Sequence, residues 1–345
     1  MLAVVKYGMA NDQVELRDVP EPTIGPEDVL LEVRATGVCG SDVEQWRHNI
    51  TYKVRVPYIM GHEFTGVIAQ VGEGVEGWRE GDEVVSETSA YVCGHCPYCR
   101  AGTYNLCPDR KGYGAHVDGA FTRFVRVPVR ALHRKPANVS WAAAALTEPG
   151  CVAYNAVVVK SAPRPGEAAV VVGPGPIGLF ALQVLRAVGA TPLVLVGTAV
   201  DATRLELGRK LGAQVTVNVE EQDPVQVVLD LTGGYGAPLV VDAAGNSPAL
   251  QQSLAMVARD GQITKVGWGP KPVGFSLDPL VGKAVRLQGS FSHTWRTWEA
   301  VLALYAAGTL DPEAMVTHRH SIREWRVAYE AMERREAVKA VLTPE

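Results

Sequence analysis

The chain has 345 residues, of which 47% are hydrophobic and 20% are charged, and its formal net charge is −4. This composition is typical of a globular protein, and the length allows two domains because one domain usually takes roughly 100–200 residues. A chain of this size buries a sizeable core without disulfide bonds. No block of Lys or Arg stands out, which argues against nucleic acid and against an anionic membrane as the main partner.

Targeting signals are not evident in the sequence. Residues 1–18 become polar too soon for a secretory signal peptide. The most apolar stretch, residues 168–185, contains glycines and prolines that break a spanning helix, so we expect no transmembrane segment. Four of the six cysteines lie within fifteen positions of one another. Without a secretion signal, such a cluster indicates a metal site rather than a disulfide framework, and we infer a reducing cytoplasm.

The first part of the chain, residues 1–155, has the pattern of a β-rich domain. It is rich in Val, Gly and Pro, and its short alternating runs predict strands joined by turns. Such runs occupy residues 29–40, 62–72 and 82–92. Near the other end of the chain, residues 297–308 and 322–336 have helical patterns. We expect residues 291–345 to return and complete the first domain.

The middle of the chain, residues 156–290, alternates between strand and helix patterns. Apolar strand patterns at 168–173 and 192–197 are followed by helix patterns at 177–190 and 202–213. The later strand patterns are at 214–219, 238–245, 261–267 and 284–290. This alternation predicts an α/β domain with a doubly wound parallel sheet and helices on both faces.

A glycine-rich turn opens the first helix of this second domain. Gly173, Gly175 and Gly178 form a GxGxxG pattern that also contains Pro176 and Ile177. The glycines allow a tight turn and a close approach of the backbone to a pyrophosphate, and the helix N-terminus offers free N–H groups. Within a βαβ pattern this turn predicts a dinucleotide site, although a purely structural turn is the alternative.

The end of the second strand favours NADP over NAD. An NAD site usually carries Asp or Glu there, about 20 residues after the glycines, to bind the ribose hydroxyls. Here the place holds Gly197 and Thr198, and no acid appears before Asp201 in the following loop. The missing carboxylate removes repulsion against a 2′-phosphate, and Arg204 and Lys210 supply positive charge. Alternatively, Asp201 reaches back to the ribose, Arg204 is a solvated helix residue, and the cofactor is NAD.

A four-cysteine motif is the strongest local signal. Cys93, Cys96, Cys99 and Cys107 follow the pattern CxxCxxCx7C. Four thiolates at this spacing close a tetrahedral shell around Zn²⁺, and a closed shell is structural rather than catalytic. We therefore predict one structural zinc ion in this segment.

A catalytic zinc ion must keep one coordination position open, so it takes three protein ligands plus water or exchanges a fourth ligand. The remaining candidates are Cys39 in GVCGSD, His62 and Glu63 in GHEFTG, and Glu148 in LTEPG. Each of these residues alone is ambiguous, and spacing does not identify the site.

Taken together, these motifs occur in the order found in one enzyme family. Residues 61–75, GHEFTGVIAQVGEGV, match the signature GHExxGxxxxxGxxV of zinc-containing alcohol dehydrogenases. GVCGSD, the four cysteines, LTEP and the glycine turn follow the family's order, and the resemblance covers essentially the whole chain. Other alcohol dehydrogenases of the family carry Cys at the position of Glu148. The sequence therefore resembles the sorbitol (polyol) and threonine dehydrogenase branch of the medium-chain dehydrogenases.

The resemblance implies a GroES-like catalytic domain, residues 1–155 with 291–345, and a Rossmann cofactor domain, residues 156–290. It implies a zinc-dependent enzyme that transfers hydride between a secondary alcohol of a polyol or sugar alcohol and NAD(P)⁺. It also implies a homotetramer. At the catalytic zinc it places Cys39, His62 and Glu148, with Glu63 as a direct or exchanging ligand and Ser41 as the acceptor of the substrate proton.

The sequence departs from the family in two places. Many relatives have a His at the position of Glu44, in a proton relay, so Glu44, His48 or water must take that part here. Threonine dehydrogenases tend to carry a His before the four cysteines, and ETSAYVC has none. This makes oxidation of threonine the less favoured alternative.

A non-catalytic, zinc-stapled binding protein of the same fold is a further alternative, although such a protein would be expected to lose the zinc ligands or the glycine turn. Asp42 is a candidate to hold His62 in place. Candidates for the substrate pocket are Trp46, His48, Tyr52, Trp268, His293 and Trp295.

Overall fold

The computed structural model describes residues 1–269 and 271–345, and the chain divides into two compact units. The first unit comprises residues 1–148, 294–307 and 312–345, and the second comprises 149–293 and 308–311. The sequence pattern placed the divisions at 155 and 290, whereas the units divide after Glu148 and His293. Helix α4 (Thr147–Tyr154) begins before the first division and ends after it, and a continuous helix gives no sequence signal of such a point.

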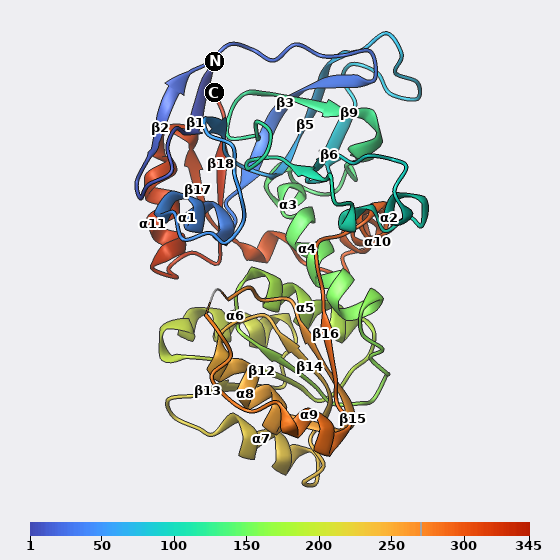
Figure 1. The fold of residues 1–345 in the computed structure, drawn as a ribbon, viewed down its shortest axis with the longest axis vertical. Coiled ribbons are helices and arrows are strands. Elements are labelled where there is room, and N and C mark those ends of the chain that lie inside the picture. The colour runs from blue at the N-terminus through green and yellow to red at the C-terminus, as the bar shows by residue number, and fades with distance from the viewer. Residues whose placement is uncertain (270) are drawn as a thin grey trace. The chain divides into compact units, whose positions relative to one another are not determined.

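The first unit is built on a seven-stranded sheet with the order β10-β6-β5-β3-β18-β17, in which β9 also pairs with β3 (Figure 1). A three-stranded sheet, β2-β1-β4, and a two-stranded sheet, β7-β8, complete it. Its strands are β1 (Leu2–Lys6), β2 (Val14–Asp18), β3 (Asp28–Gly37), β4 (Tyr58–Ile59), β5 (Glu63–Val71), β6 (Glu83–Ser86), β7 (Ser89–Tyr91), β8 (Lys111–Gly112), β9 (Phe124–Pro128), β10 (Leu132–Arg134), β17 (Val316–Ser321) and β18 (Lys339–Thr343). Buried residues alternate with partly exposed ones along the first part of β3, as expected of a strand with one face on the core.

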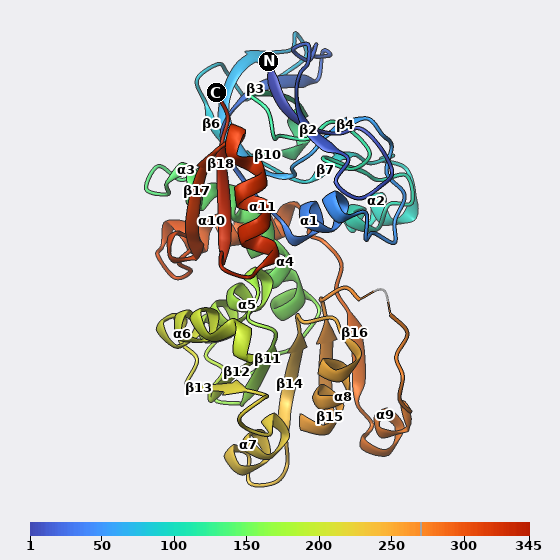
Figure 2. The ribbon, with the colours of Figure 1, turned by 90° about the vertical axis from the view of Figure 1, so that its left-hand side faces the viewer.

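The first unit also contains helices and short helical turns. They are α1 (Gly40–Arg47), α2 (Pro97–Arg100), α3 (Trp141–Ala145), α10 (Trp295–Ala306) and α11 (Trp325–Glu333), with short turns η1 (Tyr104–Leu106), η2 (Val129–Ala131), η5 (Glu313–Met315) and η6 (Ile322–Glu324). Figure 2 shows α11 beside β17 and β18, and it also contacts α1.

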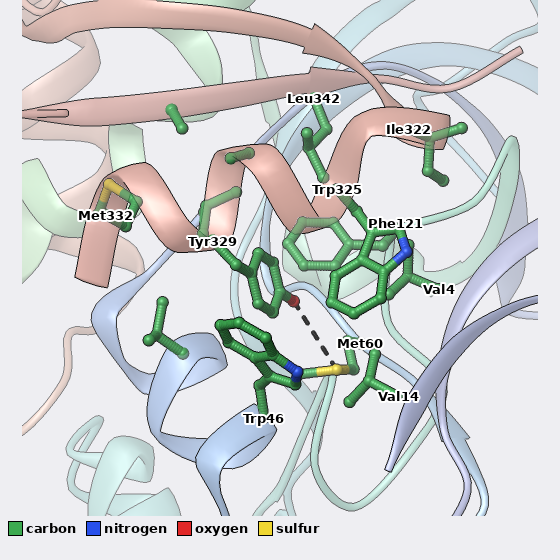
Figure 3. Packing of buried hydrophobic residues seen from close by; sticks show 14 of the residues in the cluster. Val4, Val14, Trp46, Met60, Phe121, Ile322, Trp325, Tyr329, Met332 and Leu342 are labelled. Atoms are coloured by element: carbon green, nitrogen blue, oxygen red, sulfur yellow. Dashed lines mark hydrogen bonds between the residues drawn. The ribbon is translucent and has the colours of Figure 1, made fainter. Parts of the chain in front are cut away.

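An aromatic cluster joins α1 to α11. Trp46 packs edge-on against Tyr329 and Trp325, with ring centroids 5.8 and 6.0 Å apart (Figure 3). Trp46 is 1% exposed, and its indole N–H donates to Asp12. The structure therefore places Trp46 in the core and not in a substrate pocket, because its whole ring is covered by these neighbours.

The second unit contains a six-stranded parallel sheet in the order β13-β12-β11-β14-β15-β16 (Figure 1). Numbered within the unit, this is the order 3-2-1-4-5-6 of Rossmann domains. The strands are β11 (Ala169–Val172), β12 (Leu193–Gly197), β13 (Val215–Asn218), β14 (Ala237–Asp242), β15 (Val257–Lys265) and β16 (Arg286–Gly289). The remaining elements are α5 (Pro176–Ala187), α6 (Ala202–Leu211), α7 (Pro224–Leu231), α8 (Ser247–Met256), α9 (Asp278–Lys283), η3 (Asn155–Val159) and η4 (Ala199–Asp201).

Candidate zinc centres and dinucleotide site

The four predicted cysteines lie together in the loop between β7 and β8. The sulfur atoms of Cys93, Cys96, Cys99 and Cys107 all lie within 4.8 Å of one another. All four are free thiols, without disulfide bonds. Cys96 caps the short helix α2, and its sulfur accepts the backbone N–H of Cys99 at 3.4 Å. The loop thus brings the four sulfurs together through its own backbone hydrogen bonds.

The arrangement of these sulfurs fits a zinc ion. Tetrahedral Zn–S bonds of about 2.3 Å put the sulfurs about 3.8 Å apart. Cys93 Sγ and Cys99 Sγ are 4.0 Å apart. Backbone hydrogen bonds, first that of His95 and then that of Cys96, lower the pKa of the Cys93 thiol to about 6. Burial raises the pKa of the neighbouring Cys99 thiol to about 12, so the loop favours the thiolate, the form that binds zinc, at Cys93 over Cys99.

A second group of metal-binding side chains lies where β3 and β5 meet. The antiparallel register pairs Gly37 with Glu63, so Cys39, just beyond β3, comes level with His62, just before β5. One ligand atom from each of Cys39, His62 and Glu63 lies within 4.8 Å of the others. Gly61 has φ 90°, a conformation that glycine adopts readily and other residues rarely adopt. The turn at Gly61 thus precedes the first metal-binding side chain of this segment.

Asp42 lies against two members of this group. It is fully buried in the first turn of α1, and its Oδ2 accepts the backbone N–H of Cys39 at 2.8 Å. Its Oδ1 lies 3.5 Å from His62 Nδ1. Burial lowers the pKa of His62, but the charges of Asp42 and Cys39 outweigh burial and raise that pKa well above its ordinary value. A carboxylate on one ring nitrogen leaves the other available to a metal ion, as in many zinc sites.

The carboxylate of Glu63 has a buried cation as its partner. Both of its oxygens lie 2.5 Å from Lys339 Nζ, and this ammonium also donates to the carbonyl oxygen of Val38 at 2.8 Å. The side chains of Glu63 and Lys339 are 0% and 1% exposed. Burial raises the pKa of Glu63, the charge of Lys339 opposes it, and the net shift is upward.

Glu148 does not belong to the compact group. It lies in the first turn of α4, on an element separate from the edge where β3 and β5 meet. Among the described residues, the ligand atoms within 4.8 Å of one another come from Cys39, His62 and Glu63. Of the two predicted carboxylate ligands, Glu63 is the one that lies within this group. Glu148 remains close enough for its charge to raise the pKa of Glu63.

The predicted relay residues lie on and after α1. Ser41 is half-buried and follows the N-cap Cys39 by two positions. Glu44 is exposed, and its carboxylate accepts from the Asn49 side chain at 2.7 Å. His48 ends the helix with φ 56°, and its Nδ1 is buried without a partner among the described residues. The family's relay position is therefore occupied by a side chain already hydrogen-bonded at the surface.

The glycine turn has the geometry of a phosphate-binding site. It leads from β11 into α5. The N-cap residue of α5 is Gly175, which has no side chain to cap the first turn of the helix. Gly173 has φ 97°, and a Cβ at Gly178 would lie 1.9 Å from the carbonyl oxygen of Gly173. A Cβ at Gly175 would have no heavy atom within 4 Å. Close packing thus requires glycine at positions 173 and 178. Gly175 leaves open space at the helix N-terminus, where a pyrophosphate fits.

The charged residues after β12 are engaged with one another. Asp201 Oδ2 accepts the backbone N–H of Thr198 at 3.1 Å and its hydroxyl at 2.8 Å. Arg204 is 7% exposed and lies 3.8 Å from Asp201. Lys210 lies 3.8 Å from Glu206. The basic charge expected for a 2′-phosphate is therefore paired, and Asp201 closes a turn of the chain.

Comparison with known proteins identifies the family of this chain. Residues 25–137 match the alcohol dehydrogenase GroES-like domain, and residues 176–307 match the zinc-binding dehydrogenase family. A sorbitol dehydrogenase of Halalkalibacterium halodurans is 38% identical over 345 residues, covering 100% of this chain and 99% of the relative. A D-arabitol-phosphate dehydrogenase of Enterococcus avium is 35% identical over 344 residues, covering 99% of this chain and 97% of the relative. This chain belongs to the zinc-dependent medium-chain dehydrogenases.

A solved structure of the family has the same fold. The alcohol dehydrogenase TADH from Thermus sp. ATN1 is 33% identical, with a TM-score of 0.91 and 100% coverage of both chains. The predicted fold class, a GroES-like domain with a Rossmann domain, is confirmed. The protein is accordingly a zinc-dependent dehydrogenase that uses a nicotinamide cofactor. In the described part of the chain, no helix is both long and apolar enough to cross a bilayer.

Two residues of this dehydrogenase were not singled out by the sequence. Lys339 holds Glu63 from a strand at the opposite end of the chain, and only the pairing of β18 with β3 brings them together. Glu220 lies in the loop after β13, and its carboxylate accepts the backbone N–H of Ala199 at 3.2 Å. Each contact depends on strand register, which no short motif encodes.

Proposed function

We propose that this dehydrogenase oxidises a secondary hydroxyl group of a polyol or sugar alcohol to a ketone. The observation that carries the proposal is the three-residue group of Cys39, His62 and Glu63. Catalytic zinc sites use three protein ligands and keep a further position for water or substrate. The names of the sorbitol and D-arabitol-phosphate dehydrogenases support the substrate class.

In this proposal the chain holds two zinc ions. Cys39, His62 and Glu63 would hold the catalytic ion, with Glu148 close by as a further or exchanging carboxylate. The structural ion would be held by Cys93, Cys96, Cys99 and Cys107. When bound, the catalytic zinc lowers the pKa of a hydroxyl group and the nicotinamide accepts a hydride.

The protein's own residues orient the reactants and carry the proton. Asp42 keeps the imidazole of His62 in one orientation through its 3.5 Å contact with Nδ1. Ser41 Oγ, two residues after Cys39, accepts the proton of the substrate hydroxyl and passes it to solvent. Because Glu44 is hydrogen-bonded to Asn49, His48 or water takes the next step of this relay.

The dinucleotide turn would hold the cofactor through Gly173, Gly175 and Gly178, with the backbone of Pro176 and Ile177 along the same helix start. Gly197 and Thr198 lie at the end of β12, beside the expected place of the ribose. The expectation of NADP depended on basic charge from Arg204, and that side chain is buried against Asp201. We therefore propose NAD as the preferred cofactor and NADP as the alternative.

We also propose a homotetramer in a reducing cytoplasm. Strand β16 is an outer strand of the parallel sheet, and outer strands offer unpaired N–H and C=O groups to another chain. Leu287 on this strand and Val281 on α9 are exposed apolar side chains. Four thiolate ligands need a compartment that keeps cysteines reduced. Light scattering during size-exclusion chromatography would give the mass, and a monomeric mass would contradict the assembly.

The function is tested by a metal count on purified protein together with NAD⁺ and NADP⁺ reduction over polyols, simple secondary alcohols and threonine. We expect about two zinc ions per chain, ketone formation from a polyol, and loss of activity on chelation. Preference for threonine would replace the polyol assignment with the amino-alcohol alternative. No reduction with any substrate, with one zinc ion or none, would instead favour the non-catalytic, zinc-stapled protein.

A further inference from the structure

The strand that should carry the ribose-binding acid ends without one. Dinucleotide folds that prefer NAD place an Asp or Glu at the end of the second strand, where it binds the ribose hydroxyls. Here β12 ends at Gly197 and continues into Thr198 and Ala199. The nearest acid, Asp201, is 4% exposed and accepts two hydrogen bonds from Thr198. Its carboxylate closes the turn that starts α6.

A carboxylate reaches this place from the neighbouring strand instead. β13 runs parallel to β12, and the register pairs Gly197 with Asn218. Residues that follow the two strands therefore emerge side by side, and Glu220 Oε1 accepts the backbone N–H of Ala199 at 3.2 Å. The backbone of Glu220 is itself held, because its N–H donates to Asn218 Oδ1 at 3.1 Å. Glu220 is exposed, so its carboxylate faces solvent at the end of β12.

The basic residues near Glu220 have acidic partners in α6 and in the turn before it. Arg204 faces the buried Asp201. Arg209, which lines the cavity beside Thr198 and Ala199, shares the single carboxylate of Glu206 with Lys210. A phosphate monoester carries about −1.5 to −2 charges at pH 7. Beside Glu220 these charges would be repelled, whereas the ribose hydroxyls of NAD are donors that a carboxylate accepts.

We propose that Glu220 is the specificity-determining acid of the cofactor site and selects a dinucleotide with a free ribose 2′-hydroxyl over one with a 2′-phosphate. This inference rests on the proposed dinucleotide site. It differs from the usual arrangement in the origin of the acid, which comes from the loop after the third strand of the sheet and not from the end of the second.

The test is nucleotide binding, measured by calorimetry with ADP-ribose and with its 2′-phosphate, on the full-length protein. We expect the wild-type protein to bind ADP-ribose at least about tenfold more tightly, which corresponds to one like-charge contact. Glu220→Gln should reduce this ratio to near one, and Glu220→Arg should invert it. Asp230→Asn is the matched control, because Asp230 is an exposed acid of the same unit whose carboxylate accepts from the Gln226 side chain at 2.7 Å.

The outcomes separate this inference from the function itself. A wild-type preference for the 2′-phosphate, or the same change in Asp230→Asn as in Glu220→Gln, overturns the role of Glu220 and leaves the dinucleotide site standing. If neither nucleotide binds the folded wild-type protein, the dinucleotide site is overturned, and with it this inference. Circular dichroism of each variant verifies that the domain is folded.

Discussion

The buried pair of Lys339 and Glu63 allows a sharp prediction about stability. Both side chains are almost completely removed from solvent, and the ammonium contacts both carboxylate oxygens at 2.5 Å. Lys339→Met keeps much of the aliphatic length but removes the charge. The carboxylate of Glu63 is then buried without its cation, and breaking a buried pair in this way costs about 3–5 kcal/mol.

The expected loss is large enough to measure by calorimetry. For a domain of 150–250 residues, each kcal/mol lowers the melting temperature by about 2–4 °C, so Lys339→Met should lower it by roughly 6–20 °C. The matched control is Arg17→Met. Arg17 pairs with Glu15 at 2.6 Å, but both side chains are more than 40% exposed, at 43% and 46%. Loss of such a surface pair costs about 0–1 kcal/mol.

Two further measurements test the reasoning. In the Glu63→Gln/Lys339→Met double variant no charge is left buried, so much of the lost stability should return. Zinc beside Glu63 offers another cation, so the Lys339→Met loss should be larger after chelation. If Lys339→Met costs no more than Arg17→Met in the zinc-free protein, the carboxylate is not held as a buried ion and the reasoning is refuted.

The other predictions concern the three remaining parts of the site. Cys96→Ser should remove one zinc ion per chain and lower the melting temperature, and an unchanged zinc count by atomic absorption would exclude a four-cysteine site. Ser41→Ala should lower kcat by about 10²-fold or more at unchanged zinc content, and full activity would exclude Ser41 from the relay. Gly178→Ala puts a Cβ 1.9 Å from Gly173 and should destabilise the second unit by about 1–3 kcal/mol. Gly175→Ala, whose Cβ has open space, should leave the melting temperature unchanged and weaken nucleotide binding.

The features predicted well from the sequence are those encoded within one short segment. The four cysteines lie within one loop, and the loop's own backbone hydrogen bonds gather their sulfurs. The GxGxxG turn joins one strand to the next helix, so its three glycines keep their meaning without any distant partner. Alternating strands and helices also determined the parallel sheet. For the cysteines and the glycines, short spacing along the chain keeps the residues close in space.

The features that the sequence did not predict depend on contacts between distant segments. Whether Glu63 or Glu148 joins Cys39 and His62 depends on the register of β3 with β5 and on the place of α4. Tryptophan is a residue type that can line a substrate pocket, and only the packing of Trp46 against α11 assigns it to the core. The charge of Arg204 is readable in the sequence, but its burial against Asp201 is not.

The candidate catalytic group is built on three strands that meet at one end of the large sheet. β3 leads to Cys39, β5 begins at Glu63, and β18 carries Lys339 and pairs with β3 at Gly37. Because Lys339 neutralises Glu63 from within the sheet, a buried carboxylate can be kept beside the partly exposed side chains of Cys39 and His62. The C-terminal strand is therefore both part of the sheet and part of the metal environment, which gives a physical reason for the last segment of the chain to return to the first domain.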